Sequence, residues 1–244
     1  MKYIDKEILV FKDIDKIADY IVTTWTEIAE KAVNEKGSFS VALSGGKTPA
    51  ALFQKLAKEN KLPWNRTHVF MIDERFVPYH DDNNNYRMIN EILMRHVNIP
   101  AKNIHPISTV VESPQASAMK YERELNSFFR TRPGFDLVLL GIGDDGHTAS
   151  LFPGTPSLKE KKHLAIVAPP SGAILSDRIT MTFPIINNAE NILFMAAGAD
   201  KAPVIRDVIE KEKSRLPAAM VRPVKCSPVF LLDKAAASLL SIKQ

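Results

Sequence analysis

The chain has 244 residues, of which 45% are hydrophobic and 25% charged, and its formal net charge is +4 at pH 7. Because this apolar content can build a substantial core and no linker is evident, we expect residues 1–244 to form a single domain. The basic residues are spread along the chain, which argues against nucleic acid as a partner. No stretch approaches the ~20 apolar residues of a membrane span, and the N-terminus lacks an apolar signal core. We therefore expect a cytoplasmic protein, and its one cysteine, Cys226, excludes an internal disulfide.

Short apolar runs alternate with amphipathic stretches along the chain. The first strand is predicted near Ile8–Phe11, and apolar residues at helical spacing predict a long helix over Ile14–Glu35. The later predicted elements, in chain order, are strands Phe39–Leu43 and Val69–Ile72, a helix over Tyr86–Met94, strands Leu137–Leu140, Ala165–Ala168, Ile179–Thr182 and Ile192–Ala196, a helix over Ala202–Lys213, strand Val229–Leu232 and a helix over Lys234–Ile242. This alternation predicts an α/β fold with a largely parallel open sheet and helices on both faces.

A glycine-rich loop follows the strand predicted over 39–43, with the sequence Ser44, Gly45, Gly46, Lys47, Thr48 and Pro49. Pro49 suits the first position of a helix, and Thr48 can cap it. The free amides of Gly45, Gly46 and Thr48 would then meet at a helix N-terminus, which favours an anion such as phosphate. Val41 stands where a Walker A motif requires glycine, which disfavours nucleotide triphosphate hydrolysis. Alone, the loop could equally be a structural turn.

Two more predicted strands end in polar clusters. Asp73, Glu74 and Arg75 follow the strand over 69–72, and the polar run continues to Asn85. Alone, residues 73–75 would be interpreted as a solvated ion pair. His147 follows the strand over 137–140, in a loop with several glycines. Because parallel strands end at one edge of a sheet, the repetition predicts a shared ligand cleft there.

The loop after Leu140 contains His147, a candidate general base. A histidine is largely neutral at pH 7 and can accept a proton there. Asp145 could orient the imidazole or simply cap the turn, and Ser150 lacks the GxSxG context of a nucleophile. The glycines at 141, 143 and 146 spell GxGxxG, but Pro153 arrives too soon for the long helix of a dinucleotide site. We therefore expect no nicotinamide cofactor, and the spacing of the histidine and aspartates predicts no metal site.

Two cations in the second half of the chain can reach the same cleft. Arg178 opens the predicted strand RITMTF, and Lys201 follows the predicted strand over 192–196. A cation just beyond a strand's carboxyl end lies where a ligand phosphate would be held. Considered alone, each of these residues would be interpreted as an ordinary surface charge.

Five segments together carry a family resemblance: SGGKTP at 44–49, DERFVP at 73–78, LGIGDDGHTASLFPG at 140–154, RITMT at 178–182 and GADKA at 198–202. In this order they resemble the 6-phosphogluconolactonases of the glucosamine-6-phosphate isomerase/6-phosphogluconolactonase family, along essentially the whole chain. DGHTASLFPG is highly specific, whereas SGGxTP is shared with the isomerases and deaminases. The resemblance implies a Rossmann-like fold of the glucosamine-6-phosphate deaminase type. It also implies hydrolysis of 6-phospho-D-glucono-1,5-lactone to 6-phosphogluconate in the oxidative pentose phosphate pathway, without a cofactor.

The resemblance also implies roles for particular residues. His147 would be the general base on water, Arg75 would bind substrate or stabilise the tetrahedral charge, and Asp145 and Asp73 would serve in chemistry or in loop shape. The residues implied to hold the phosphorylated sugar lactone are Ser44, Gly45, Gly46, Thr48, Asn85, Arg178 and Lys201. The family commonly has serine where this chain has Asn84, which concerns only fine loop geometry.

Two alternatives come from other classes. An amino-sugar phosphate isomerase or deaminase would have the motif DEY, with a tyrosine at the position of Arg75. It would also have a glutamate at the position of Phe152, five residues after the histidine. A non-catalytic sugar-phosphate sensor fused to a DNA-binding domain would carry an N-terminal helix-turn-helix module, for which a first strand near residue 8 leaves no room. A stand-alone regulatory subunit would need no such module, but the intact His147 and its flanking aspartates favour an enzyme. The sequence makes no prediction of oligomeric state.

Overall fold

The computed structural model describes residues 6–130, 133–170 and 176–241. Within these ranges seven strands form one sheet in the order β1-β10-β9-β6-β2-β3-β5, and every neighbouring pair is parallel. The strands are β1 (Glu7–Phe11), β2 (Phe39–Leu43), β3 (Thr67–Met71), β5 (Ile104–His105), β6 (Leu137–Gly141), β9 (Ile192–Ala196) and β10 (Val229–Asp233). The predicted α/β class with a largely parallel sheet is confirmed.

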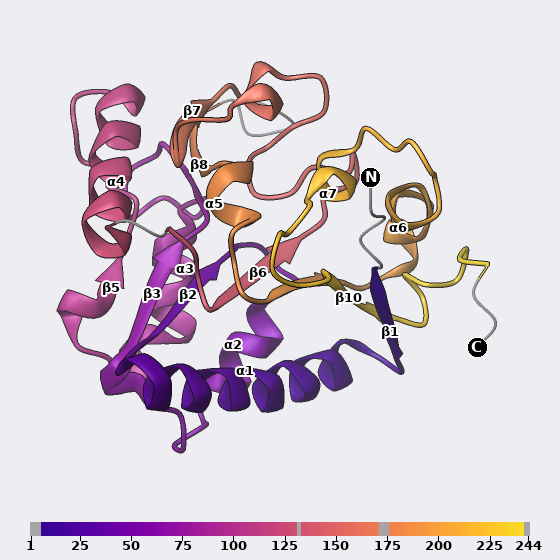
Figure 1. Ribbon diagram of the computed structural model, residues 1–244, viewed down its shortest axis with the longest axis horizontal. Helices are drawn as coiled ribbons and strands as arrows, with labels where there is room; N and C mark the ends of the chain where they lie inside the picture. The colour runs from indigo at the N-terminus through magenta and orange to yellow at the C-terminus, as the bar shows by residue number, and fades with distance from the viewer. Residues whose placement is uncertain (1–5, 131–132, 171–175, 242–244) are drawn as a thin grey trace.

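Helices cover both faces of this sheet, as predicted. Helices α1 and α2 lie along one face, and α4 and α5 lie on the other (Figure 1). The helices are α1 (Ile14–Lys36), α2 (Ala50–Leu56), α3 (Asn85–Ile92), α4 (Pro114–Phe129), α5 (Phe183–Ile186), α6 (Ala202–Ile209) and α7 (Pro217–Met220). Helix α1 begins after Asp13, whose side chain accepts from the amide of Lys16 at 3.0 Å, and ends at Gly37, which has a left-handed φ of 80°.

A second, smaller sheet departs from the predicted arrangement. It contains β4 (Asp73–Arg75), β8 (Arg178–Met181) and β7 (Ala165–Ala168), in the order β4-β8-β7, and both of its pairs are antiparallel. The runs over 165–168 and 179–182 are therefore strands, but they do not extend the parallel sheet. A short apolar run does not reveal its pairing partner: β7 pairs with the nearby β8, and β8 pairs on its other side with β4, about 100 residues away. The pairing sets Arg75 opposite Arg178.

Several predicted boundaries are wrong. Helices α4, α5 and α7 and strands β4 and β5 were not predicted, and α6 ends at Ile209 rather than at residue 213. The helix predicted over Lys234–Ile242 is a series of turns over 234–239, and residue 242 lies outside the described ranges. The carboxylate of Asp233 accepts hydrogen bonds from Ala236 at 2.7 Å and from Gly198 at 3.1 Å, which tie the start of these turns to the loop after β9.

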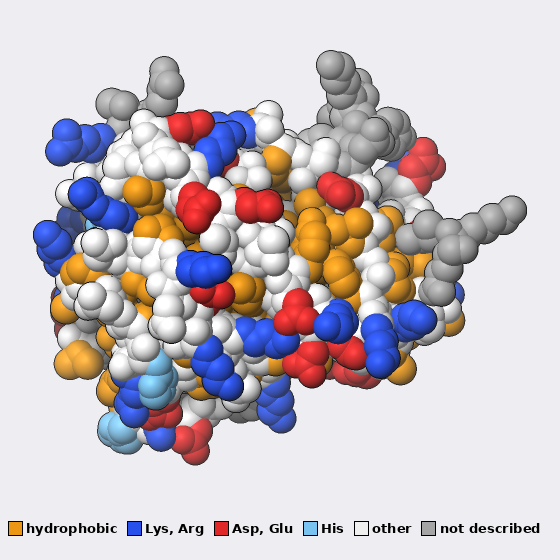
Figure 2. Space-filling view, turned by 90° about the horizontal axis from the view of Figure 1, so that it is seen from below, with side chains coloured by type: hydrophobic (Ala, Val, Ile, Leu, Met, Phe, Trp, Pro, Cys, Tyr) orange, Lys and Arg blue, Asp and Glu red, His pale blue; other side chains and the backbone are white. Residues whose placement is uncertain are grey.

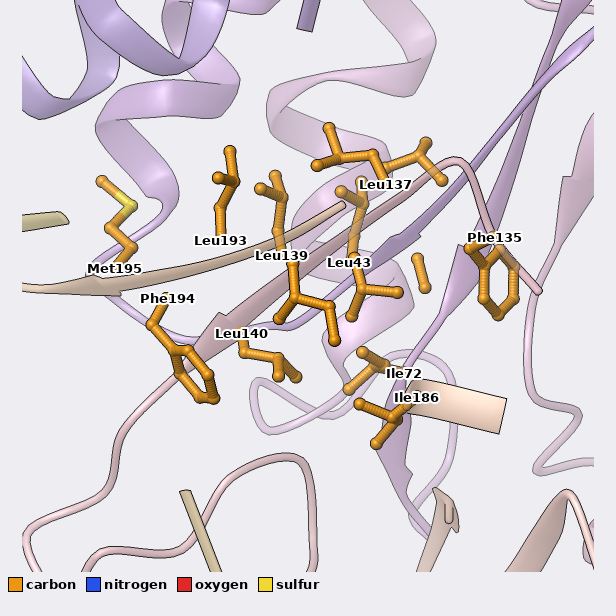
Figure 3. Close-up of a cluster of buried hydrophobic side chains, with 14 of the residues drawn as sticks. Leu43, Ile72, Phe135, Leu137, Leu139, Leu140, Ile186, Leu193, Phe194 and Met195 are labelled. Atoms are coloured by element: carbon orange, nitrogen blue, oxygen red, sulfur yellow. The ribbon is translucent and has the colours of Figure 1, made fainter. Parts of the chain in front are cut away.

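The centre of the parallel sheet is buried on both faces. Figure 3 shows side chains of β6 and β9 packed above and below the strands, including Leu139, Leu140, Leu193 and Phe194. These residues are at most 6% exposed, which explains why the strands lack the alternation of a half-exposed sheet. A rigid centre of this kind holds the loops at the carboxyl ends of β2 and β6 in fixed relative positions.

Candidate active site

A cleft of about 310 Å³ opens at the carboxyl edge of the parallel sheet, beside β4 and β8 of the small sheet. This volume lies at the lower end for small-molecule sites and suits a single sugar phosphate. Ten of the eleven predicted site residues line it: Ser44, Gly45, Gly46, Thr48, Asp73, Arg75, Asn85, His147, Arg178 and Lys201. The eleventh, Asp145, contacts His147. The three polar loops therefore meet at one cleft, as the strand ends predicted.

His147 and Asp145 form a directed pair. Nδ1 of His147 lies 2.5 Å from Oδ1 of Asp145, and the same oxygen accepts from the His147 backbone amide at 3.0 Å. Nε2 of His147 has no hydrogen-bond partner among the described residues. Burial acts to raise the pKa of Asp145, but the amide and the ring of His147 outweigh it, so this pKa lies below its usual value. An ionised Asp145 favours the tautomer that leaves the Nε2 lone pair free.

The glycines around His147 have specific steric reasons. A Cβ on Gly143 would lie 2.1 Å from Cε1 and Nδ1 of the His147 ring, so only glycine lets the imidazole pack there. Gly146 has a φ of 80°, which favours glycine, and a Cβ on it would meet Leu216 at 2.8 Å. The amide of Gly143 donates to the His147 carbonyl at 2.9 Å. These glycines therefore shape the turn that presents His147.

The glycine loop after β2 contributes a second wall. Gly46 has a φ of 106°, and nothing lies within 4 Å of the position its Cβ would take. Ser44 Oγ donates to the carbonyl of Leu139 in β6 at 3.0 Å, which ties the loop to the loop of His147. The prediction that Thr48 caps the following helix is wrong. Helix α2 begins at Ala50, so Pro49 is the N-cap residue rather than the first helical residue, and no side chain caps the helix. The amide of Ala50 instead donates to the carbonyl of Lys47 at 3.2 Å.

Asp73 is buried at the base of the cleft, with 6% of its surface exposed. Its carboxylate accepts a hydrogen bond from Ser150 Oγ, and Nδ2 of Asn85 donates to its backbone oxygen at 3.0 Å. Ser150 is fully buried and committed to this contact, which fits the expectation that it is no nucleophile. Arg75 lies beside Asp73 and donates from Nη1 to the carbonyl of Asn83 at 2.8 Å.

The two predicted cations both reach the cleft, by different routes. Arg178 is only 7% exposed, and its guanidinium lies 5.3 Å from the ring centre of Phe152. Burial lowers the pKa of Arg178 from its usual value, with Asp73 opposing the change, and its Nε has no hydrogen-bond partner in the described ranges. Nζ of Lys201 forms an ion pair with the exposed carboxylate of Asp144. An anion in the cleft could accept from the guanidinium of Arg178 and compete with Asp144 for Lys201.

Comparison with known proteins decides the family. The family model for glucosamine-6-phosphate isomerases/6-phosphogluconolactonase matches residues 12–230. The chain belongs to this family. A 6-phosphogluconolactonase from Nostoc sp. is 40% identical over 245 residues, covering 98% of this chain and 96% of the relative. The crystal structure of the Thermotoga maritima 6-phosphogluconolactonase superposes with a TM-score of 0.84 at 34% identity, covering 94% of this chain and all of that one.

The same fold also occurs in a more distantly similar protein. A monomeric glucosamine-6-phosphate deaminase has a TM-score of 0.82 at 19% identity, covering 96% of this chain and all of that one. At this identity the likeness concerns the fold alone. Within this family member, Phe152 is 3% exposed and packs against His147, with ring centres 4.6 Å apart. Isomerases and deaminases are expected to have a glutamate at this position. In this chain the apolar ring of Phe152 lies against the candidate base His147 instead.

Two contributors to this site, Asp144 and Glu74, were not predicted. Asp144 pairs with Lys201, and Glu74 accepts from the first amides of α3. Outside the cleft, the cap of α3 by Asn84 was not predicted either. The signal for Asn84 was available, because asparagine is a preferred N-cap and its side chain accepts from Arg87 at 2.8 Å. It also explains why asparagine can stand where the family commonly has serine, since both residues cap well.

Proposed function

We propose that this chain hydrolyses 6-phospho-D-glucono-1,5-lactone to 6-phosphogluconate, the lactonase step of the oxidative pentose phosphate pathway, with His147 as general base. The observation that carries the proposal is the pairing of His147 with Asp145 at a cleft that also contains Arg75, Arg178 and Lys201. The curated relatives with this activity, at up to 40% identity over nearly the whole chain, support the same reaction.

The chemistry follows from the free Nε2 of His147. A water molecule beside the lactone carbonyl gives its proton to Nε2 as its oxygen bonds to C1, and Asp145 stabilises the imidazolium that forms. Negative charge develops on the carbonyl oxygen, and the guanidinium of Arg75 stabilises it. When the tetrahedral intermediate collapses, the bond from C1 to the ring oxygen breaks, and the imidazolium returns its proton to that oxygen. Water is added across the ester, and no covalent enzyme intermediate forms.

The phosphate would bind at the other side of the cleft. The amides of Gly45 and Gly46 can donate to it, and Arg178 and Lys201 supply positive charge. Lys201 would exchange Asp144 for the phosphate, so the cation is already held near its working position when the cleft is empty. Asn85 and Asp73 would contact the sugar ring, Asp73 through the carboxylate that Ser150 holds.

The remaining expectations stay part of this proposal. They are a single domain over residues 1–244, a small phosphorylated lactone as the partner, and a cytoplasmic location. None of the described helices is long and apolar enough to cross a membrane. Basic and acidic side chains are interspersed over the face that α1 covers, rather than gathered into a basic stripe (Figure 2). This arrangement supports the expectation that nucleic acid is not the partner.

The test is hydrolysis of freshly generated 6-phosphogluconolactone at neutral pH, with EDTA present, against the spontaneous rate. His147→Ala should lower kcat by ~10²- to 10⁴-fold, the usual contribution of a general base. His163→Ala is the matched control, because His163 also pairs through Nδ1 with a carboxylate, at 3.0 Å from Glu122, but lies outside the cleft. A wild type that does not exceed the spontaneous rate would overturn the proposed activity. Equal rates for wild type and His147→Ala would overturn the role of His147.

A further inference from the structure

Glu74 is a fully buried carboxylate beside the cleft, and the proposed mechanism does not use it. It is the middle residue of β4, between Asp73 and Arg75, and consecutive side chains of a strand point to opposite faces. Asp73 and Arg75 line the cleft, whereas Glu74 is not part of its wall. Glu74 therefore points away from a bound substrate and can affect the site only through other groups.

The carboxylate of Glu74 accepts hydrogen bonds from three backbone amides. Oε1 accepts from Arg75 and Asn85, at 2.9 and 2.7 Å, and Oε2 accepts from Tyr86 at 2.8 Å. Asn85 and Tyr86 are the first two residues of α3, so their amides have no partner inside the helix. The N-cap Asn84 accepts from the next amide along. Glu74 thus accepts from the first two amides of α3, and Asn84 accepts from the third. The negative charge of Glu74 also interacts favourably with the positive end of the helix dipole.

The position of Asn85 determines how the glycine loop packs. Oδ1 of Asn85 lies where a Cβ on Gly45 would be only 2.0 Å away, and Nδ2 donates to the carbonyl of Asp73. A shift of the first turn of α3 would therefore move a side chain that touches both Gly45 and Asp73. The amide of Arg75 depends on the same carboxylate. Glu74 thereby connects β4, the start of α3 and the glycine loop, which lie in separate parts of the sequence.

A carboxylate is the side chain that fits this place. Burial raises the pKa of Glu74 to about 7, against the three amides that favour its charged form, and the charge of Asp73 adds to the rise. A neutral glutamine would keep one acceptor oxygen for Arg75 and Asn85, but its NH₂ group would face the amide of Tyr86, another donor. Burying a charge is costly unless it is fully hydrogen-bonded, and a buried amide without an acceptor is also costly. The carboxylate therefore needs the three amides as donors, and the amides need the carboxylate as their acceptor.

We propose that Glu74 is a positioning residue of the active site, which fixes Arg75 and Asn85 against the substrate through their backbone amides without touching it. This inference rests on the proposed lactone hydrolysis, in which Arg75 stabilises the developing charge. Displacing a catalytic group by about 1 Å can cost ~10²-fold in rate. The phosphate contacts do not depend on Glu74 alone, because Ser44 also ties the glycine loop to Leu139 and Asp144 holds Lys201. Loss of the Glu74 anchor should therefore lower kcat more than it raises KM.

The experiment compares Glu74→Gln with the matched control Asn84→Ala. Both variants remove acceptors from the start of α3, but Asn84 does not line the cleft. We expect Glu74→Gln to lower kcat by ~10- to 100-fold with less than about a threefold change in KM, and Asn84→Ala to lower Tm while kcat of the folded protein stays within about threefold. If Glu74→Gln does not fold, Glu74→Asp keeps the charge but cannot reach both sets of amides, and is expected to behave in the same way.

Two results would overturn the proposal. One is unchanged kcat in Glu74→Gln, and the other is an equal loss in both variants that follows Tm, which would make Glu74 a structural cap only. If the wild type does not exceed the spontaneous rate, the proposed function fails, and calorimetric affinity for 6-phosphogluconate decides on Glu74 instead. The carboxylate of this product, unlike the neutral carbonyl of the lactone, would meet Arg75 and so reports the position of that guanidinium. An affinity at least tenfold weaker in Glu74→Gln than in Asn84→Ala would support the positioning role, and equal affinities would overturn it.

Discussion

Replacing Asp145 with asparagine tests whether the carboxylate beside His147 controls the base. The change keeps the size of the side chain, and its oxygen can still accept from the His147 backbone amide, which lies 3.0 Å away and closes the turn. The loop should therefore keep its shape, and Tm should stay within a few degrees. What is lost is the charge that lies 2.5 Å from Nδ1 of His147. An asparagine can also direct its NH₂ group at Nδ1, which favours the tautomer with the proton on Nε2.

The expected size of the effect follows from exposure. A charge-assisted hydrogen bond contributes about 1.5 to 3 kcal/mol, and the side chains of His147 and Asp145 are 30% and 48% exposed, so solvent screens the interaction. We therefore take the lower part of this range, about 1.5 to 2 kcal/mol, which corresponds to a ~10- to 30-fold loss of kcat/KM. The assay is lactone hydrolysis at pH 7.5, corrected for spontaneous opening, with Tm measured on the same samples.

Two outcomes would refute this reasoning. Activity of Asp145→Asn within about threefold of the wild type, with unchanged Tm, would mean that Asp145 only shapes the turn. A loss of activity that is matched by a large fall in Tm would mean that the asparagine disturbed the loop, and Asp145→Ala would then show the same combined loss. We predict instead that kcat/KM falls while Tm stays unchanged.

Two further predictions concern sterics and pH. Gly143→Ala should lower kcat/KM by ~10²-fold with a small change in Tm, because its Cβ would displace the His147 ring by more than about 1 Å; normal activity would contradict the packing. His68, whose Nδ1 lies 3.0 Å from Nε2 of His105, has its pKa lowered to about 4 by burial and by His105 and Lys102. The unfolded state therefore binds more protons between pH 6.5 and pH 4, and stability is lost as pH falls through this window. After discounting for exposure, His68→Gln should reduce this loss by about 1 to 2 kcal/mol in urea unfolding, and parallel curves for both proteins would contradict it.

Much of the fold could be predicted because it depends on local patterns. Uninterrupted apolar runs such as Leu137–Leu140 indicate strands buried on both faces, and their alternation with helices predicts a parallel sheet. The convergence of the loops after β2 and β6 follows from the same logic, since parallel strands end at one edge. The prediction failed for the small antiparallel sheet, because the pairing of Asp73–Arg75 with Arg178–Met181 depends on contacts across about 100 residues that no local pattern encodes.

The sequence by itself determined which residues can do the chemistry: a histidine two residues after an aspartate, glycines that permit close approach, and cations beyond strand ends. Tertiary structure alone decided which atoms meet. It leaves Nε2 of His147 free by joining Nδ1 to Asp145, and it turns Glu74 away from the cleft to hold the amides of Asn85 and Tyr86. The physical reason is that residue type and strand register are local properties, whereas a hydrogen bond requires two groups to be placed within about 3 Å by the packing of the whole core.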